Sequence, residues 1–330
     1  MPPRFILRAM TIQEVPLSAI DFCDETFRIT EDLDLPRMSA SLQAVGQMNP
    51  VILQEGAAPA GYRIICGFRR LHALRFLGRA AAAAGLRQPA ESGPLQDLLT
   101  AVWDNLAHRQ FGPLEAARVL HTLRHHCGVE EEALVERFLP LLGITAHRNV
   151  LRSYLKLHDL CPGLRCLLTT GHLTLASAER LARTSPETQA KVLPVLSRIR
   201  LSASLQREVL ELAEDLAAIS ETTLEEVLNQ PEILAIADAT GLSAFQKGEK
   251  VHALLYQQRN PRISDVRATF LAEKTLLNLP GTIRLSPDPF FESPRLRVEF
   301  DAGSAQAFRE AVDALERACR ASSLDRMYRI

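Results

Sequence analysis

The chain of 330 residues is 47% hydrophobic and only 23% charged, a composition that excludes an intrinsically disordered protein. Its formal net charge of −1 argues against a dedicated nucleic-acid binder, which usually carries a basic excess. No apolar run approaches the roughly 20 residues of a membrane span, so we expect a cytoplasmic protein without a membrane partner.

The first hundred residues mix short strand-like runs with turns. FILRAMTIQEVPL (5–17) is one such run. PVILQ (50–54) and YRIICG (62–67) are two more, and EGAAPAG (55–61) between them predicts a hairpin connection. LHALRFLGRAAAAAGL (71–86) is expected to begin as a helix and to decay into a mobile alanine-rich stretch that reaches ESGP (91–94).

The rest of the chain is predicted to be mostly helical. From residue 95 to about residue 275, leucines and alanines recur at intervals of three and four residues between proline breaks. The period then changes, because TIRLS (282–286) and RLRVEF (295–300) alternate apolar and polar residues. We therefore expect a hairpin there, followed by an amphipathic helix over 305–319.

A glycine and two arginines stand where the second strand of the predicted hairpin meets the helix. Glycine allows the backbone to approach a ligand closely, and the unpaired N–H groups of a helix N-terminus favour anions. Arg69 and Arg70 add planar donor groups suited to phosphate oxygens. The turn at Gly67 is therefore a candidate polyphosphate site, although paired arginines at a helix end are often only solvated.

A second segment offers groups of the kind that a magnesium nucleotide requires. In WDNLAHRQFGPLEAARVL (103–120), the oxygens of Asp104 and Asn105 suit a divalent cation that bridges phosphates. His108 and Arg109 lie about one helical turn further along. Taken alone, such a segment is also typical of an ordinary solvated helix end.

Together these segments resemble the ParB family of CTP-binding partition proteins, whose amino-terminal domain is shared with sulfiredoxin. The family's G-x-x-x-P entry, G-E-R-R-x-R-A turn, E-N-x-x-R helix and P-x-E-x-A stretch read here as GQMNP (46–50), GFRRLHA (67–73), DNLAH (104–108) and PLEAA (113–117). The resemblance covers about residues 10–185. It implies an α+β protein with a nucleotide-binding domain (1–112), a helical domain with a helix-turn-helix-like region (113–232), and a helical extension with a hairpin-helix module (233–330).

The resemblance also implies ligands, which are CTP and Mg²⁺, and a homodimer as the assembly. Asp104 and Asn105 would hold the metal. The residues implied at the nucleotide are Gly46, Gln47, Met48, Asn49, Pro50, Gly67, Phe68, Arg69, Arg70, His72, Asn105, His108 and Arg109.

Departures from the family pattern concern the acidic and basic positions. Phe68 and Asp104 replace glutamates, and His72 and His108 replace arginines. An aspartate is one methylene shorter than a glutamate, so we expect CTP binding with slow or absent hydrolysis. The alternative is a degenerate scaffold that binds no nucleotide. A sulfiredoxin-like repair enzyme is discounted, because the reactive cysteine of that family follows the turn glycine, where this chain has Phe68.

The region 131–182 resembles the helix-turn-helix of ParB relatives, except at its turn. There FLPLLGITAHR (138–148) is longer, more apolar and interrupted by a proline. Arg148, Arg152 and Lys156 lie on one predicted helix face, which suits DNA but is equally typical of a solvated helix. We therefore favour a CTP switch that acts on a protein partner. The alternative is a sequence-specific DNA-binding partition or transcription factor.

One further pattern suggests a metal site. His121 and His125 are four residues apart, a spacing that can bind zinc from one helical face. The sequence offers no third ligand beside them, so packed or solvated histidines are the preferred interpretation.

Overall fold

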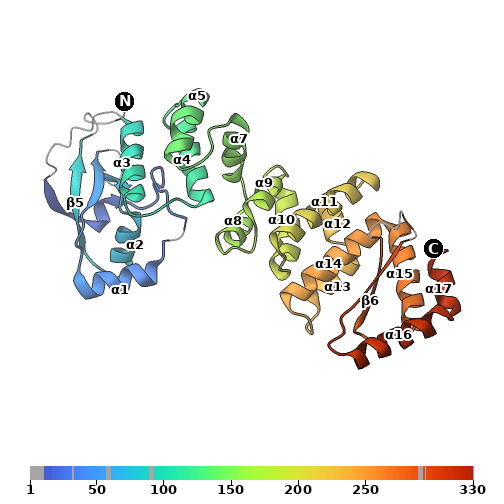
Figure 1. Cartoon of the computed structure of the whole chain (residues 1–330). Coiled ribbons are helices and arrows are strands. Elements are labelled where there is room, and N and C mark those ends of the chain that lie inside the picture. Colours follow the sequence, from blue (N-terminus) through green and yellow to red (C-terminus); the bar gives the residue numbers. More distant parts are fainter. Residues whose placement is uncertain are drawn as a thin grey trace. The chain divides into compact units, whose positions relative to one another are not determined.

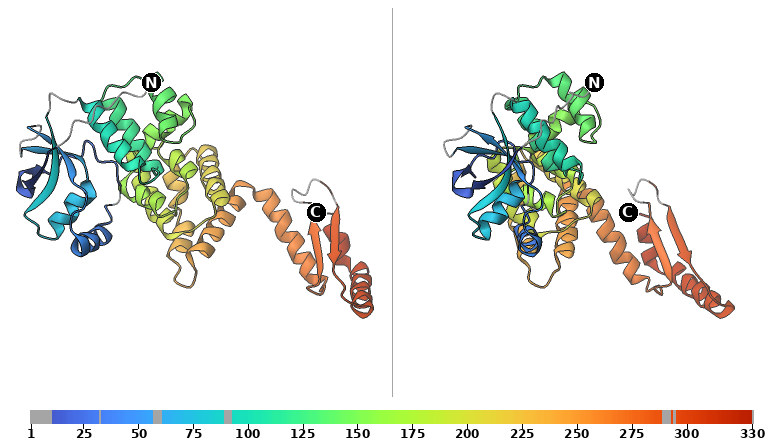
Figure 2. Two further views of the ribbon diagram at one scale, coloured as in Figure 1. Left: turned by 60° about the vertical axis from the view of Figure 1, so that its left-hand side comes forward. Right: turned by 90° about the vertical axis from the view of Figure 1, so that its left-hand side faces the viewer.

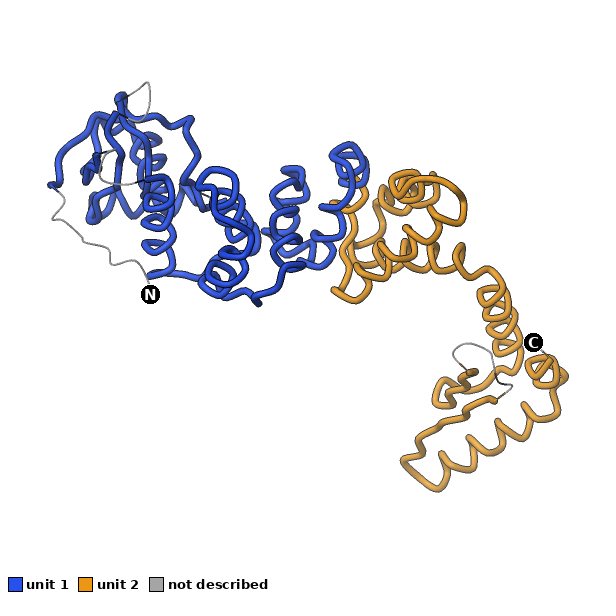
Figure 3. The backbone as a smooth tube through the Cα atoms, turned by 90° about the horizontal axis from the view of Figure 1, so that it is seen from above, with its two compact units in different colours: residues 1–193 blue, residues 194–330 orange. Residues whose placement is uncertain are grey.

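The computed structural model describes residues 11–31, 33–56, 61–88, 93–288, 293 and 295–329. The chain forms two compact units, residues 1–193 and 194–330 (Figure 3). The α+β class is confirmed, with a sheet and helices first, helices through the middle, and a small hairpin with helices at the end (Figure 1). The three-domain division with boundaries at 112/113 and 232/233 stays a prediction.

A mixed sheet forms the start of the first unit. In the part of the chain that is described, its strand order is β1-β5-β3-β4-β2. The predicted hairpin is confirmed by the antiparallel pairing of β3 and β4, and its connection over 57–60 lies outside the described residues. β5 runs parallel to β3 and antiparallel to β1. The strands are β1 (Ile12–Pro16), β2 (Ile20–Asp21), β3 (Val51–Glu55), β4 (Tyr62–Cys66) and β5 (Ala81–Arg87).

The alanine-rich stretch over 81–87 is a strand and not a decaying helix or a mobile loop, so the sequence prediction was wrong there; the part of the predicted loop over 89–92 lies outside the described residues. The preceding helix ends at Phe76, and Gly78 with φ +67° turns the chain away from helical conformation. β5 then pairs with a neighbour on each edge, and Ala82 and Ala84 are completely buried. Two sheet edges and burial override the helix propensity of alanine.

Helices pack on the sheet and continue through the first unit, and the last of them, α10, extends into the second. One hydrophobic core extends from Val15 in β1 to Leu151, so it crosses the predicted boundary at 112/113. The helices are the 3₁₀ turn η1 (Leu17–Ala19), α1 (Leu35–Val45), α2 (Phe68–Phe76), α3 (Pro94–Leu106), α4 (Pro113–His125), α5 (Glu131–Ala133), the π-helix η3 (Leu134–Phe138), α6 (Leu139–Leu141), α7 (Arg148–Leu157), α8 (Pro162–Thr169), α9 (Leu175–Leu181) and α10 (Pro186–Arg198).

Pro140 does not interrupt the helix that precedes the predicted turn, contrary to the sequence interpretation. The helical run continues from α5 through η3 to α6, and the N–H of Leu139 donates to the carbonyl of Leu134, five residues earlier. A π-helical turn is wider than an α-helical turn. It therefore accommodates a residue without an N–H, and the chain leaves helical conformation only after Leu141.

The second unit ends in the predicted hairpin and helix. Phe270, Leu277, Leu285, Ala318 and Met327 form a buried cluster that joins α15, β6, α16 and α17, which Figure 2 shows side by side. No described helix is long and apolar enough to cross a bilayer. The elements are α11 (Ala203–Ile219), α12 (Leu224–Leu228), α13 (Pro231–Asp238), α14 (Ala244–Arg259), α15 (Pro261–Leu276), β6 (Ile283–Pro287), β7 (Leu296–Phe300), α16 (Ala305–Cys319) and α17 (Ser322–Met327).

Candidate nucleotide site

The turn from β4 to α2 requires a glycine. Gly67 has φ +100°, and a Cβ at this position would lie 2.6 Å from Cγ1 of Val51. The side chain of Phe68 is buried in the core, so of this residue only the main chain can face a ligand. The first N–H groups of α2 have no intrahelical partner and favour an anion.

Arg70 brings three of the predicted segments together. Its Nη1 donates to the carbonyl oxygens of Asn49 at 2.9 Å and Pro50 at 2.7 Å. Its Nη2 lies 3.9 Å from Oδ2 of Asp104. Arg70 therefore fixes the 46–50 loop beside α2 and α3, and much of its donor capacity is already used.

Arg69 and His72, three residues apart on α2, have polar atoms that the protein leaves unsatisfied. Nε of Arg69 and Nε2 of His72 are buried and have no hydrogen-bond partner. Burial, and next the charge of Arg28, lower the pKa of His72, while Glu25 acts in the opposite direction. Each buried, unpaired polar atom costs about 1–3 kcal/mol. Such atoms indicate that a ligand or water completes this face.

The 46–50 loop is anchored by a glutamine. The side chain of Gln47 accepts from the N–H of Ala83 at 2.9 Å and donates to the carbonyl of the same residue at 2.7 Å. Met48 is 77% exposed, and Asn49 is also exposed. Gly46 ends α1 with φ +71°. Gln47 is therefore a structural residue of this loop, while Met48 and Asn49 are its accessible side chains.

Cys66 is a buried hydrogen-bond donor. Its thiol donates to Oδ2 of Asp104 at 2.8 Å. Burial, followed by the hydrogen bond and the negative charge of Asp104, raises the pKa of Cys66 well above its usual range. Because the thiolate is the reactive form, this thiol is not a nucleophile. It instead orients the Asp104 carboxylate, which is the predicted metal ligand.

Asn105 and Arg109 bind one another and not the turn. Nη2 of Arg109 donates to Oδ1 of Asn105 at 3.2 Å and to Oγ1 of Thr30 at 3.0 Å. Its Nη1 contacts Oε2 of Glu115 at 2.5 Å. His108 is exposed in the turn after α3. For Asn105 or Arg109 to contact a ligand, these internal bonds would have to exchange.

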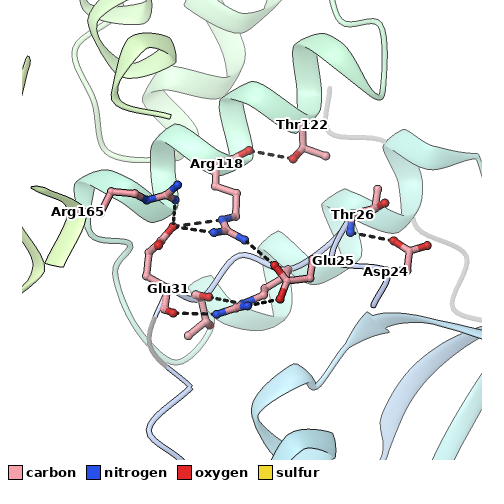
Figure 4. Close-up of polar contacts among 9 residues, drawn as sticks. Asp24, Glu25, Thr26, Glu31, Arg118, Thr122 and Arg165 are labelled. Carbon is pink, nitrogen blue, oxygen red and sulfur yellow. Dashed lines mark hydrogen bonds and ion pairs between the residues drawn. The ribbon is translucent and has the colours of Figure 1, made fainter. Parts of the chain in front are cut away.

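Glu31 is the centre of an ion-pair network that the sequence did not predict (Figure 4). Its Oε1 lies 3.1 Å from Nη2 of Arg118 in α4 and 2.6 Å from Nη2 of Arg165 in α8. Arg28 donates to the backbone carbonyl of Glu31 at 2.9 Å. The loop over 22–31 is thereby tied to two helices that follow it far along the chain, and no local sequence signal reveals such pairs.

The basic face proposed for DNA is present but partly neutralised. Arg148, Arg152 and Lys156 are exposed on α7. Nη2 of Arg148 lies 3.2 Å from Glu132, and Nη2 of Arg152 lies 4.0 Å from Glu131. These carboxylates reduce the positive potential of the face.

The structure adds a third imidazole to the predicted histidine pair. The rings of His121 and His158 stack with centroids 3.8 Å apart, and His125 lies 4.5 Å from His121. Burial, and then the neighbouring His158 and His125, lower the pKa of His121 to about 4. Among the residues that the structure describes, no group of three or more His, Cys, Asp or Glu side chains suits a metal ion. The stacked rings agree with the packed histidines that the sequence favours.

A comparison with protein-family models matches residues 6–101 to the ParB N-terminal domain. The match assigns this first part of the chain to the ParB N-terminal domain. The match includes the 46–50 loop, the Gly67 turn and β5, whereas Asp104 and Asn105 lie just beyond it.

Solved ParB structures are similar to this chain at low sequence identity. One is the C-terminally truncated chromosome-partitioning protein ParB from Caulobacter crescentus complexed with CTP-gamma-S, with 19% identity over 57% of this chain and 99% of that chain and a TM-score of 0.26. The truncated Caulobacter crescentus protein complexed to the centromeric parS site has 18% identity over 65% and 96%, with a TM-score of 0.33. The C2221 form of a Pnob8-like ParB-N domain has 16% identity over 70% and 98%, with a TM-score of 0.32. No curated protein sequence matches the chain. At these TM-scores we draw the assignment from the domain match.

Proposed function

We propose that this chain is a molecular switch that binds CTP at the β4–α2 turn. The observation that carries the proposal is the buried, unpartnered Nε of Arg69, two residues after Gly67 and inside the matched domain. The N-terminal amides of α2 and the guanidinium of Arg69 would bind the phosphates. The accessible side chains of the 46–50 loop would lie against the base.

Of the two residues predicted to hold Mg²⁺, only Asp104 has a side-chain oxygen available for the ion. Asp104 is held by the Cys66 thiol through one oxygen, and its side chain is 41% exposed. The oxygen of Asn105 is already bound to Arg109. Protein-bound Mg²⁺ often uses one or two carboxylates together with substrate phosphates. Asp104 would therefore hold the ion, which would neutralise phosphate charge. With the shorter aspartate at this position, we propose slow or absent hydrolysis.

The switch would act through the loop over 22–31. The ring of Phe22 contacts His72 on the nucleotide-facing side of α2, with centroids 5.3 Å apart. At the other end of the loop, Glu31 binds Arg118 and Arg165. A ligand that moves this face of α2 would therefore pull on α4 and α8.

Dimerisation is proposed for the hairpin-helix module at the end of the chain. Val298, Phe308 and Val312 are 46%, 53% and 42% exposed there. Apolar side chains gathered on a small module favour burial against a second copy. In sedimentation velocity, we expect a dimer at micromolar concentration that Phe308→Asp weakens. Phe245→Asp, at a site of α14 that is 47% exposed, should leave the dimer intact. A monomer with and without CTP would remove this part of the proposal.

Nucleotide choice is tested by thermal unfolding of the full chain with Mg²⁺ and CTP, ATP, GTP or UTP. A ligand at 100 times its Kd stabilises a protein by about 2.7 kcal/mol, which raises Tm by several degrees. Of the four nucleotides, we expect only CTP to give this shift. In a separate assay of CTP hydrolysis, phosphate release should be near the uncatalysed level. No shift with any of the four would leave a scaffold that binds no nucleotide.

The alternative function, a DNA-binding partition or transcription factor, is favoured by the three exposed basic side chains of α7. It predicts binding to DNA fragments that weakens steeply with salt and that is lost in Arg152→Ala. A salt-independent, weak interaction would count against it. In that case the proposed target is a protein partner.

A further inference from the structure

A groove beside the C-terminal half of α2 is independent of the Gly67 turn. It has a volume of about 450 Å³, and its walls include Ser18, Asp21, Phe22, Arg75 and Arg79. One wall is the segment around β2, and the other is the end of α2 with the turn that follows it. Nothing in the proposed function assigns a ligand to this groove.

Two cations in the groove lack an anionic partner. Arg75 and Arg79 are exposed, and neither has a carboxylate partner among the described residues. The guanidinium of Arg75 lies over the ring of Phe22, 4.8 Å from its centroid. Asp21 also lines the groove, but its Oδ1 accepts from the N–H groups of Cys23 at 2.9 Å and Asp24 at 3.2 Å. The groove therefore presents more free positive than negative charge.

Behind Phe22, which lines the groove, lies a buried imidazole nitrogen without a hydrogen-bond partner. The ring of Phe22 packs edge-on against His72, whose Nε2 is buried without a partner. Burial, and next the charges of Arg28 and of Arg75, lower the pKa of His72, while Glu25 raises it. The donors that face the groove itself are the guanidinium groups of Arg75 and Arg79, which suit phosphate oxygens.

We propose that this groove binds phosphate groups, with Arg75 and Arg79 as the principal donors. The phosphates come either from the tail of the nucleotide bound at α2 or from a separate phosphate-bearing ligand. The site does not require CTP at the turn, because its donors differ from the helix N-terminus and Arg69. The groove can therefore bind phosphate even if the turn binds no nucleotide.

Calorimetric titration of the full chain with pyrophosphate tests the groove. We expect binding that Arg79→Ala or Arg75→Ala weakens about tenfold or more. Arg37→Ala, which removes an exposed arginine from α1 outside the groove, is the matched control and should bind as the wild type does. Any pyrophosphate that binds at the turn should be weakened in Arg69→Ala, whereas binding in the groove should remain, which separates the groove from the turn. Circular dichroism of each variant checks that it is folded.

Two further arms identify the source of the phosphate. If the nucleotide tail occupies the groove, Arg79→Ala also weakens CTP binding, leaves cytidine binding unchanged, and pyrophosphate competes with CTP. If a separate ligand occupies it, CTP binds to Arg79→Ala normally and alongside pyrophosphate. Failure of pyrophosphate to bind at millimolar concentration, or unchanged binding in both arginine variants, would overturn the proposal.

Discussion

Replacing Gly67 by alanine should destabilise the first unit in two separable ways. The first is conformational, because a side chain at φ +100° is strained and costs about 1–2 kcal/mol. The second is steric, because the new Cβ would lie 2.6 Å from Cγ1 and 3.0 Å from Cβ of Val51. Overpacking of this kind costs about 1–3 kcal/mol. The two together predict a loss of about 2–5 kcal/mol in the free energy of unfolding.

Gly78→Ala is the matched control for the conformational part. Gly78 has φ +67°, and a Cβ there would meet nothing within 4 Å. It should therefore cost about 1 kcal/mol. Urea unfolding followed by the fluorescence of Trp103, the single tryptophan and a residue of α3, reports on the first unit.

A double-mutant cycle isolates the steric part. Val51→Ala removes the Cγ1 methyl group that the new Cβ would meet. In the Val51→Ala background, the destabilisation by Gly67→Ala should therefore be smaller than in the wild type, by at least about 1 kcal/mol. Equal losses for Gly67→Ala and Gly78→Ala, or no coupling with Val51→Ala, would refute the account of this turn.

Three further predictions concern charged and titratable groups. Glu31→Gln removes the charge that two guanidinium groups share and should lower the free energy of unfolding by about 1–3 kcal/mol; an unchanged urea midpoint would contradict the network. Arg87→Ala removes the cation 2.9 Å from the buried Asp97 and should cost about 3 kcal/mol, whereas a loss below about 1 kcal/mol would show that Asp97 does not depend on it. The pKa of His121 is lowered to about 4 in the folded state. Its contribution to the free energy of unfolding should therefore be fully present above about pH 6.5 and decrease as the pH falls towards 4. His121→Gln should flatten that pH dependence, measured as Tm against pH, and an unaltered profile would assign it to other groups.

Local sequence signals were sufficient for the turn but not for all of the sheet. Gly67 between an apolar run and a helical run indicated a close backbone approach, and the structure has one. The alanines of β5 gave the opposite signal to their conformation, because pairing with β1 and β3 decides it and neither partner adjoins β5 in sequence. Alanine propensity alone favours a helix.

Side-chain partners explain most of what the sequence could not reveal about the site. Motif matching treated Arg69 and Arg70 alike, yet only Arg69 keeps an unsatisfied buried nitrogen, because carbonyls of the 46–50 loop bind Arg70. The contact of Cys66 with Asp104 depends on how α3 packs beside β4, which no local pattern shows. Glu31 meets Arg165 across 134 positions of sequence, beyond the reach of any local pattern.

Calorimetric titration of the full chain with CTP and Mg²⁺, wild type against Arg69→Ala, tests the central claim most directly. Loss of a charge-assisted pair of about 1.5–3 kcal/mol predicts an affinity lower by about 10- to 100-fold. The control Arg37→Ala should bind as the wild type does. Equal affinity of wild type and Arg69→Ala for CTP, or no binding to either, would contradict the assignment of the β4–α2 turn as the nucleotide site.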